Sequence, residues 1–348
     1  MAVGAEPSTE TSAETSTGMT LAHKVLGSPT LRLAGRRLLA VIPVLWGVTL
    51  LTFLVMNLLP GDTAQVLLGA NATPAQVHQL EIRLHLNEPF WVRYGGWLGG
   101  VLHGNLGTSL ASGENVTTIL GQRLPVTAEL LIYAFVGSIV LAVLLAVLAA
   151  RRPNGIADRF SVVISMTGLS VAPYVLAVVL VYLFAVKLQW FPAIGYTSLT
   201  ASPLENIRSL TLPAIAIGFP LFAVYTRLLR ADIVEQMQRE DYIVTARAKG
   251  VPSWHILVRH ALPNSMFGMI TLVALNLGAL VGAVAIIEPI FSLPGVGAIL
   301  ISSINNHDVP IVEGVVLVFA AVVVVAALAA DLVYAVLDPR IRYERSAS

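Results

Sequence analysis

Six long runs of apolar residues divide the chain, and each is long enough to cross a membrane as a helix. A helix rises about 1.5 Å per residue, so about 20 apolar residues cover the roughly 30 Å of the hydrocarbon core. The runs occupy residues 37–59, 127–150, 160–186, 209–229, 264–287 and 312–337. The pattern therefore predicts an all-α integral membrane protein with six transmembrane helices.

The composition agrees with a membrane setting. Hydrophobic residues make up 56% of the chain and charged residues 12%, about half of the roughly 25% that is usual in soluble proteins. The mean hydropathy is +0.79. The chain has no cysteine, which excludes disulfides, thiol chemistry and cysteine metal sites. Its net charge of +1 gives no indication of a nucleic-acid partner, and we expect none.

The basic residues between the runs predict the orientation in the membrane. They gather before the first run and after the second, fourth and sixth runs, whereas residues 288–311 contain none. Because cytoplasmic loops of membrane proteins carry the excess of Lys and Arg, both termini should be cytoplasmic, in a bacterial cell membrane. The polar residues 1–32 should form a disordered cytoplasmic tail, residues 33–343 the transmembrane domain, and residues 344–348 a second short tail.

A long segment on the opposite side, residues 60–126, is expected to lie outside the cytoplasm and to contain a helix. Thr73 and Gln76 have the spacing of a capping box at a helix start. Three side chains that ligate metals then share one helical face: His78, Glu81 and His85. These side chains could bind a metal, but a solvated polar face is the favoured interpretation, and we predict no metal in this chain.

The segment from residue 231 to 263 is a polar hairpin between the fourth and fifth runs. Residues 241–249 favour a short helix, which Gly250 should end, with Pro252 just beyond it and Ser253 capping the next helix. The residues alone leave two interpretations open. The hairpin is either a docking element for a soluble partner or a charged cytoplasmic loop without a further role.

The residue types in the hairpin suit a docking surface. Ala246 and Ala248 are small, so another protein can approach closely, and Arg247 and Lys249 offer charge-assisted contacts. Tyr242 supplies an aromatic anchor of the kind that interfaces favour.

The hairpin resembles the EAA motif of permease subunits of bacterial ABC importers, in the TARAKG form of the dipeptide and oligopeptide branch. The acidic residue, the alanine and the glycine of the motif are matched by Asp241, Ala246 and Gly250, whereas the leading Glu-Ala-Ala is not strictly kept. The resemblance implies that the coupling residues are Asp241, Tyr242, Thr245, Ala246, Arg247, Ala248, Lys249, Gly250, Leu262 and Pro263.

Five other strings, in the same order and topology, are similar to the B-type permease subunit of this peptide/nickel branch, and the similarity covers residues 33–343. They are LLPGD at 58–62, GNLGTSL at 104–110, RLPVTAEL at 123–130, FSLPGVG at 291–297 and DVPIVEGVVL at 308–317. The resemblance therefore implies an importer permease with peptide as the solute. A nickel chelate, glutathione or haem remains an alternative solute.

The same resemblance implies several partners. Two permease subunits, expected to be paralogues, form the pathway in membrane lipid, two ATPase subunits receive the coupling helices, and an extracytoplasmic protein delivers the solute. This chain has no G-x-x-x-x-G-K-[ST] phosphate loop. It is therefore expected not to be an enzyme and to hold no cofactor, because ATP and Mg²⁺ belong to the ATPases.

Two other classes compete with an importer permease. An ion-gradient-driven secondary transporter should have ionisable residues and broken helices at membrane depth in matching halves, but the apolar runs here are poor in charge. An intramembrane enzyme should have catalytic residues at membrane depth, but the histidines lie in tails or loops.

A few residues within or at the edge of the runs are candidates for the solute pathway or for helix packing. Polar side chains are costly in a membrane, so Asn57, Asn276 and Glu288 are candidates to line the pathway. Gly278 and Gly282 form a small-xxx-small pair, which favours close packing of helices.

Overall fold

Most of the part of the chain that the structure describes is helical. The structure is a computed structural model, and it describes residues 29–59, 63–69 and 71–337. Within these ranges there is no strand element, only one isolated bridge between Thr108 and Asn115. The predicted all-α fold is confirmed there. Of the predicted tails, residues 1–28 and 344–348 lie outside the described residues, and residues 29–32 belong to the first helix.

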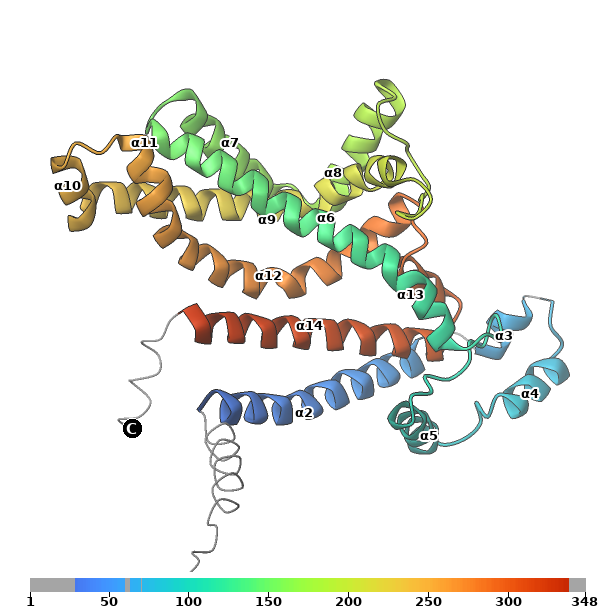
Figure 1. The fold of residues 1–348 in the computed structure, drawn as a ribbon. Helices are drawn as coiled ribbons and strands as arrows, with labels where there is room; N and C mark the ends of the chain where they lie inside the picture. Colours follow the sequence, from blue (N-terminus) through green and yellow to red (C-terminus); the bar gives the residue numbers. More distant parts are fainter. Residues whose placement is uncertain (1–28, 60–62, 70, 338–348) are drawn as a thin grey trace, which may run out of the picture.

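Five long helices form the body of the molecule (Figure 1). They are α2 (Pro29–Leu58), α6 (Val116–Arg151), α9 (Pro203–Arg239), α12 (Leu262–Ile290) and α14 (Val309–Leu337). Among the described residues, four segments are long and apolar enough to cross a membrane: Val41–Leu58 of α2, all of α6, all of α9 and Val309–Ala329 of α14. The predicted run at 264–287 lies within the 29 residues of α12.

The predicted single helix over residues 160–186 is wrong. Two helices, α7 (Ile156–Ser170) and α8 (Pro173–Leu180), meet there at 110°, and α8 continues as the π-helix Val181–Lys187. Proline disfavours helical backbone in the residue before it, and Ala172 is accordingly extended (φ −66°, ψ 140°). The pair counts as a fifth span only if both helices form one broken span. The number six therefore stays a prediction.

The main core lies between α6, α9 and α12. Helices α6 and α9 pack along much of their length, because small residues line their contact: a methyl group at Gly218 would lie 2.8 Å from the carbonyl oxygen of Ala134. Leu130, Tyr225 and Ile287 are fully buried in this core. Helix α14 packs on the other side of α12, and α2 packs against α14 (Figure 1).

The segment between the first two long helices contains three short helices, α3 (Thr63–Leu68), α4 (Pro74–Arg83) and α5 (Phe90–Leu102). Thr73 and Gln76 form the predicted capping box at the start of α4. The aromatic side chains of α5 pack against α2 and the start of α14. These helices lie at one end of the bundle, and the short helices that follow α9 lie at the other (Figure 1).

Candidate functional site

The hairpin is built around the helix α10 (Asp241–Ala248), which follows α9 after a single extended residue, Glu240. Gly250 adopts φ +77°, and two backbone bonds close the helix end: Gly250 N–H donates to Arg247 O (2.9 Å) and Val251 N–H donates to Ala246 O (3.2 Å). This pair of bonds is a Schellman motif, which requires the left-handed backbone that glycine adopts most readily. The predicted helix and its termination at Gly250 are confirmed.

The chain returns to the bundle through α11 (Ser253–Ile256) and the π-helix Leu257–Ala261, which leads directly into α12. The prediction that Ser253 caps this helix is wrong. Pro252 occupies the capping position with extended backbone (φ −60°, ψ 139°), and Ser253 is the first helical residue. The fixed φ of proline suits that extended position and leaves the first turn without a side-chain cap.

One face of α10 packs on the core, and the other is open. Ile243 is only 1% exposed, and Ala246 is half-buried beside it. Most of the predicted coupling residues lie on the open face, namely Asp241, Tyr242, Thr245, Arg247, Ala248, Lys249 and Gly250. Pro263 is also exposed, whereas Leu262 is half-buried. The hairpin therefore presents small and charged residues on a helix whose back is anchored.

Side-chain hydrogen bonds hold α10 to both neighbouring long helices. The Tyr242 hydroxyl donates to Gln236 Oε1 on α9 and accepts a bond from Asn264 Nδ2 on α12 (3.0 Å). Arg247 Nη2 donates to Met237 O on α9 (2.8 Å). Tyr242 thus has a structural role that the sequence did not predict. No ion pair within the described residues involves Arg247 or Lys249, so their charges remain available to a partner.

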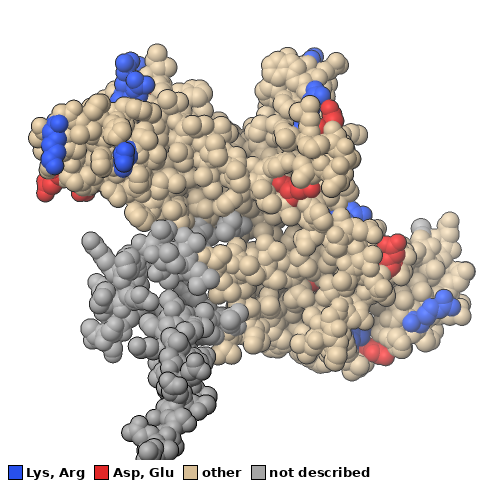
Figure 2. All heavy atoms as spheres, in the orientation of Figure 1, with Lys and Arg blue, Asp and Glu red and all other residues tan. Residues whose placement is uncertain are grey.

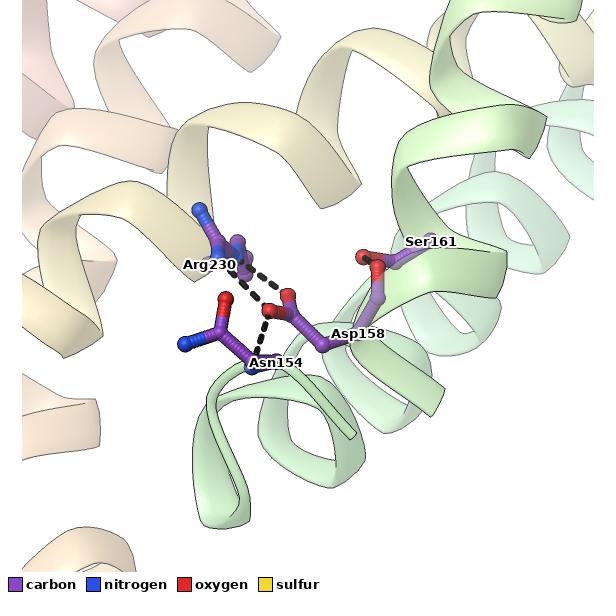
Figure 3. Close-up of polar contacts among 4 residues, drawn as sticks. All are labelled: Asn154, Asp158, Ser161 and Arg230. Carbon is purple, nitrogen blue, oxygen red and sulfur yellow. Dashed lines mark hydrogen bonds and ion pairs between the residues drawn. The ribbon is translucent and has the colours of Figure 1, made fainter. Parts of the chain in front are cut away.

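An ion pair between the partly exposed Arg230 and the buried Asp158 stabilises this end of the bundle (Figure 3). Arg230 on α9 donates from Nε to Asp158 Oδ1 (2.7 Å) and from Nη2 to Asp158 Oδ2 (2.9 Å). The backbone N–H of Asn154 also donates to Asp158 Oδ2 (2.8 Å). Such bidentate ion pairs fix the orientation of the guanidinium and the carboxylate as well as the distance between them. The pair locks the α6–α7 connection to α9, and the sequence indicated Arg230 only as one of many cytoplasmic basic residues.

The basic side chains gather at the end that carries α10. Figure 2 shows Lys and Arg over this end, and an adjoining face without charged side chains. Next to the hairpin, Arg151 lies over the ring of Trp254, 5.4 Å from its centroid. Trp254 and Val244 are both largely exposed. Charge and exposed apolar surface therefore occur together at the hairpin.

The three predicted pathway residues all bond within the chain. Asn57 Nδ2 donates to Phe53 O (2.7 Å), and Asn276 Nδ2 donates to Leu272 O (2.8 Å), both one helical turn back. Asn57 Oδ1 also accepts a bond from Arg93 Nη1 (3.0 Å). The structure does not bring the three residues together. Their role in a pathway stays a prediction.

Glu288, the third of these residues, is fully buried between α6, α12 and α13 (Val296–Asn305). Thr127 Oγ1 donates to its Oε1 (2.6 Å), and the N–H of Ala298 donates to its Oε2 (3.0 Å). Thr127 in turn accepts a bond from Val296 N–H (2.8 Å). A methyl group at Gly295 would overlap the carboxylate. Glu288 thus ties the 291–297 string to the 123–130 string.

A second buried carboxylate joins two more of the strings noted in the sequence. Asp308 is 1% exposed. It accepts bonds from Ser109 Oγ (2.5 Å) and from the N–H groups of Leu110 (3.0 Å) and Ala111 (3.4 Å). The 104–110 and 308–317 strings therefore form one structural unit. An acidic residue just before a helix start is only a weak sequence signal for a buried structural carboxylate. The partners of Asp308 lie about 200 residues away in the sequence, so they could not be predicted.

The remaining predicted residues have simple surroundings. A methyl group at Gly278 would lie 3.6 Å from Val323 on α14, whereas Gly282 has open space beside it. His78 pairs with Glu81 (3.2 Å) and His85 with Glu88 (2.9 Å). Within the described ranges no three His, Asp or Glu side chains are arranged to hold a metal.

A polar cluster lies in the connection after the π-helix 181–187. The Tyr196 hydroxyl donates to Glu129 Oε2 (3.0 Å), which also accepts a bond from Asn206 Nδ2 (2.8 Å). Burial, and then the hydrogen bond to Glu129, raise the pKa of Tyr196 to about 12. The neutral phenol is therefore the form that the folded protein stabilises.

Comparison with known proteins places the chain in a family. Residues 142–343 match the family "Binding-protein-dependent transport system inner membrane component", and residues 30–131 match the N-terminal component of such transport systems. The first family covers more than half of the chain. The strings at 291–297 and 308–317, with the hairpin, lie within it.

Curated relatives match over nearly their whole length. The dipeptide transport system permease protein DppB of Alkalihalophilus pseudofirmus is 36% identical over 330 residues, which are 89% of this chain and 99% of the relative. A putative peptide transport system permease of Brucella abortus is 36% identical over 309 residues (89% and 98%). A probable peptide ABC transporter permease of Sinorhizobium fredii is 36% identical over 308 residues (88% and 98%).

These matches confirm the resemblance that the sequence strings indicated, and together with the apolar helices they make the protein a multi-pass membrane protein. The chain belongs to the family of binding-protein-dependent transport system inner membrane components, the permeases of ABC importers.

Proposed function

We propose that this chain is one of two permease subunits of an ATP-driven importer and that the hairpin around α10 receives mechanical work from separate ATPase subunits. The observation that carries the proposal is the geometry of α10. Its open face presents small and charged residues, and its other face packs on the core through Ile243. Tyr242 and Arg247 also bond the helix to α9 and α12. A partner that presses on α10 therefore presses on two long helices at once.

The transmission path follows from the contacts. Displacement of α10 moves the end of α9, and the Asp158–Arg230 pair passes this movement to α7. Packed helices have discrete arrangements rather than a continuous range, so the bundle acts as a two-state element. ATP binding to the partners would favour the outward-open arrangement, and hydrolysis would restore the other one.

The proposal includes an orientation and a set of partners. The hairpin and both termini face the cytoplasm, α3 to α5 lie outside, and six spans cross the membrane. The second permease, expected to be a paralogue, completes the pathway, and ATP with Mg²⁺ binds only to the ATPases. An extracytoplasmic binding protein delivers the solute.

Short peptides are the proposed solute, because the relatives of similar length are named as dipeptide and peptide permeases. A nickel chelate, glutathione or haem would be carried by the same architecture. The proposal assigns the choice among these solutes to the extracytoplasmic binding protein.

Purification of the tagged chain in mild detergent, followed by mass spectrometry, tests the proposal. We expect two ATPases, or one fused ATPase, with a second permease and a solute-binding protein whose bound ligand identifies the solute. A chain that purifies alone and transports peptide in vesicles without ATP would refute the proposal in favour of a gradient-driven carrier.

A further inference from the structure

A cavity of about 440 Å³ lies at the end of the bundle opposite the hairpin. It is open to solvent on one side and is lined by α2, by the residues that follow α4, by α5 and by the start of α14. Its lining includes Phe53, His85, Glu88, Arg93, Trp97 and Glu313. The volume is within the range of small-molecule sites, about 300–1,000 Å³. None of these residues belongs to the proposed coupling hairpin.

Glu313 is the unusual member of this cavity. The residue is 1% exposed, and its Oε1 has no hydrogen-bond partner among the described residues. The indole Nε1 of Trp97 is also buried and lacks an acceptor there. Buried polar groups are normally paired, because leaving one unpaired costs about 1–3 kcal/mol and more for a charge. Glu313 and Trp97 both line the cavity, and each carries one buried polar atom without a partner among the described residues.

Arg93 adds a positive group to the cavity without neutralising Glu313. Its guanidinium lies over the ring of Phe53, 5.6 Å from the centroid, and donates one bond to Asn57 Oδ1 (3.0 Å). The guanidinium has five N–H donors, so most of them remain free for another acceptor. No ion pair joins Arg93 to Glu313 within the described residues. A carboxyl group and a guanidinium thus line one cavity without an ion pair between them.

We propose that this cavity binds a short zwitterionic solute, with its ammonium group at Glu313 and its carboxylate or carbonyl oxygens at Arg93 and Trp97. A ligand that carries both charges satisfies each unpaired group at once, and Phe53 gives its side chain an apolar wall. The inference rests on the proposed function in one respect, the identification of the natural zwitterion as a short peptide. The cavity then holds the peptide on its way into the permease.

Calorimetric titration of the complete complex in nanodiscs with dialanine, in the absence of the binding protein, tests this site. Glu313→Gln keeps the shape of the side chain but removes its charge, and it should weaken dialanine binding about tenfold or more. N-acetyl-dialanine should bind about as weakly to the wild-type complex. Glu81→Gln is the matched control, because Glu81 lies on α4 outside the cavity lining and pairs with His78.

A thermal unfolding scan separates ligand binding from a structural role. Glu313 has no hydrogen bond to lose among the described residues, so Glu313→Gln should not lower Tm. The proposal is overturned if the wild-type complex does not bind dialanine, if Glu313→Gln binds it as tightly, or if the N-acetyl derivative binds equally well. Binding-protein-stimulated ATP hydrolysis in the same nanodiscs tests the proposed function separately. If the wild-type complex shows no such stimulation, the proposed function is refuted, whatever the titration gives.

Discussion

Replacement of Gly250 by alanine is expected to weaken the coupling of ATP hydrolysis to transport. A methyl group at Gly250 would meet no atom within 4 Å, so the change has no steric cost. The cost lies in the backbone, because φ is +77° and an L-residue pays about 1–2 kcal/mol to adopt the left-handed conformation. That free energy lowers the population of the helix end with both backbone bonds formed about 5- to 30-fold, relative to conformations in which the α10 terminus is open.

The assay is ATP hydrolysis by the reconstituted complex, measured with and without the loaded binding protein. The stimulation should fall in the order Gly250, Gly250→Asn, Gly250→Ala, Gly250→Val. Asparagine tolerates left-handed backbone better than alanine, and β-branched valine tolerates it least. The amount of chain in the membrane should stay the same across the series, since the side chain would lie in open space.

Gly104 provides a matched control at the far end of the molecule. It ends α5 with φ +79° and with the same pair of bonds, Gly104 N–H to Val101 O and Asn105 N–H to Gly100 O, both 2.9 Å. A methyl group there also meets nothing within 4 Å. Gly104→Ala therefore imposes the same strain away from the hairpin and should leave stimulation near that of the wild type. Equal losses in both variants, or full stimulation of Gly250→Ala, would refute the reasoning.

Three further predictions concern the bundle. Gly295→Ala should destabilise the fold by about 3–5 kcal/mol, because the methyl group displaces the buried Glu288 carboxylate from its partners; an unchanged Tm in detergent would contradict this. Asp158→Ala should cost about 3 kcal/mol, the low end for a broken buried pair, because Arg230 keeps some access to solvent; Asp158→Ala,Arg230→Met should recover part of the Tm. The raised pKa of Tyr196 means that its contribution to stability is present below pH 10 and is lost as pH rises through about 12. The absorbance titration of Tyr196→Phe is subtracted from that of the wild type to isolate this phenol. The difference should show one phenol that ionises near pH 12, and ionisation near pH 10 would contradict the prediction.

The helical architecture and the hairpin could be predicted because their signals are local. Apolar length defines the long helices, and the Gly250–Pro252 spacing defines the end of α10. The break between α7 and α8 also had a local signal in Pro173, which was outweighed by the uninterrupted apolar run around it. Hydropathy reports burial in lipid or protein and does not report helix direction.

The polar interior of the bundle could not be predicted, because its partners lie far apart in sequence. Asp158 meets Arg230, and Thr127 meets Glu288, only after the helices have packed. The sequence indicated Glu288 as a pathway candidate only because a polar side chain is costly to place in a membrane. That cost is met by bonds within the chain, which no single-residue pattern reveals.

Cross-linking from the open face of α10 tests the central claim most directly. The chain has no cysteine, so Ala248→Cys in the exposed part of the hairpin gives one thiol, which is labelled with a benzophenone maleimide in the assembled complex. We expect a covalent adduct with an ATPase subunit, with a yield that changes when ATP is added. Ser112→Cys, exposed at the opposite end, should give none. An adduct from Ser112→Cys and none from Ala248→Cys would contradict the account.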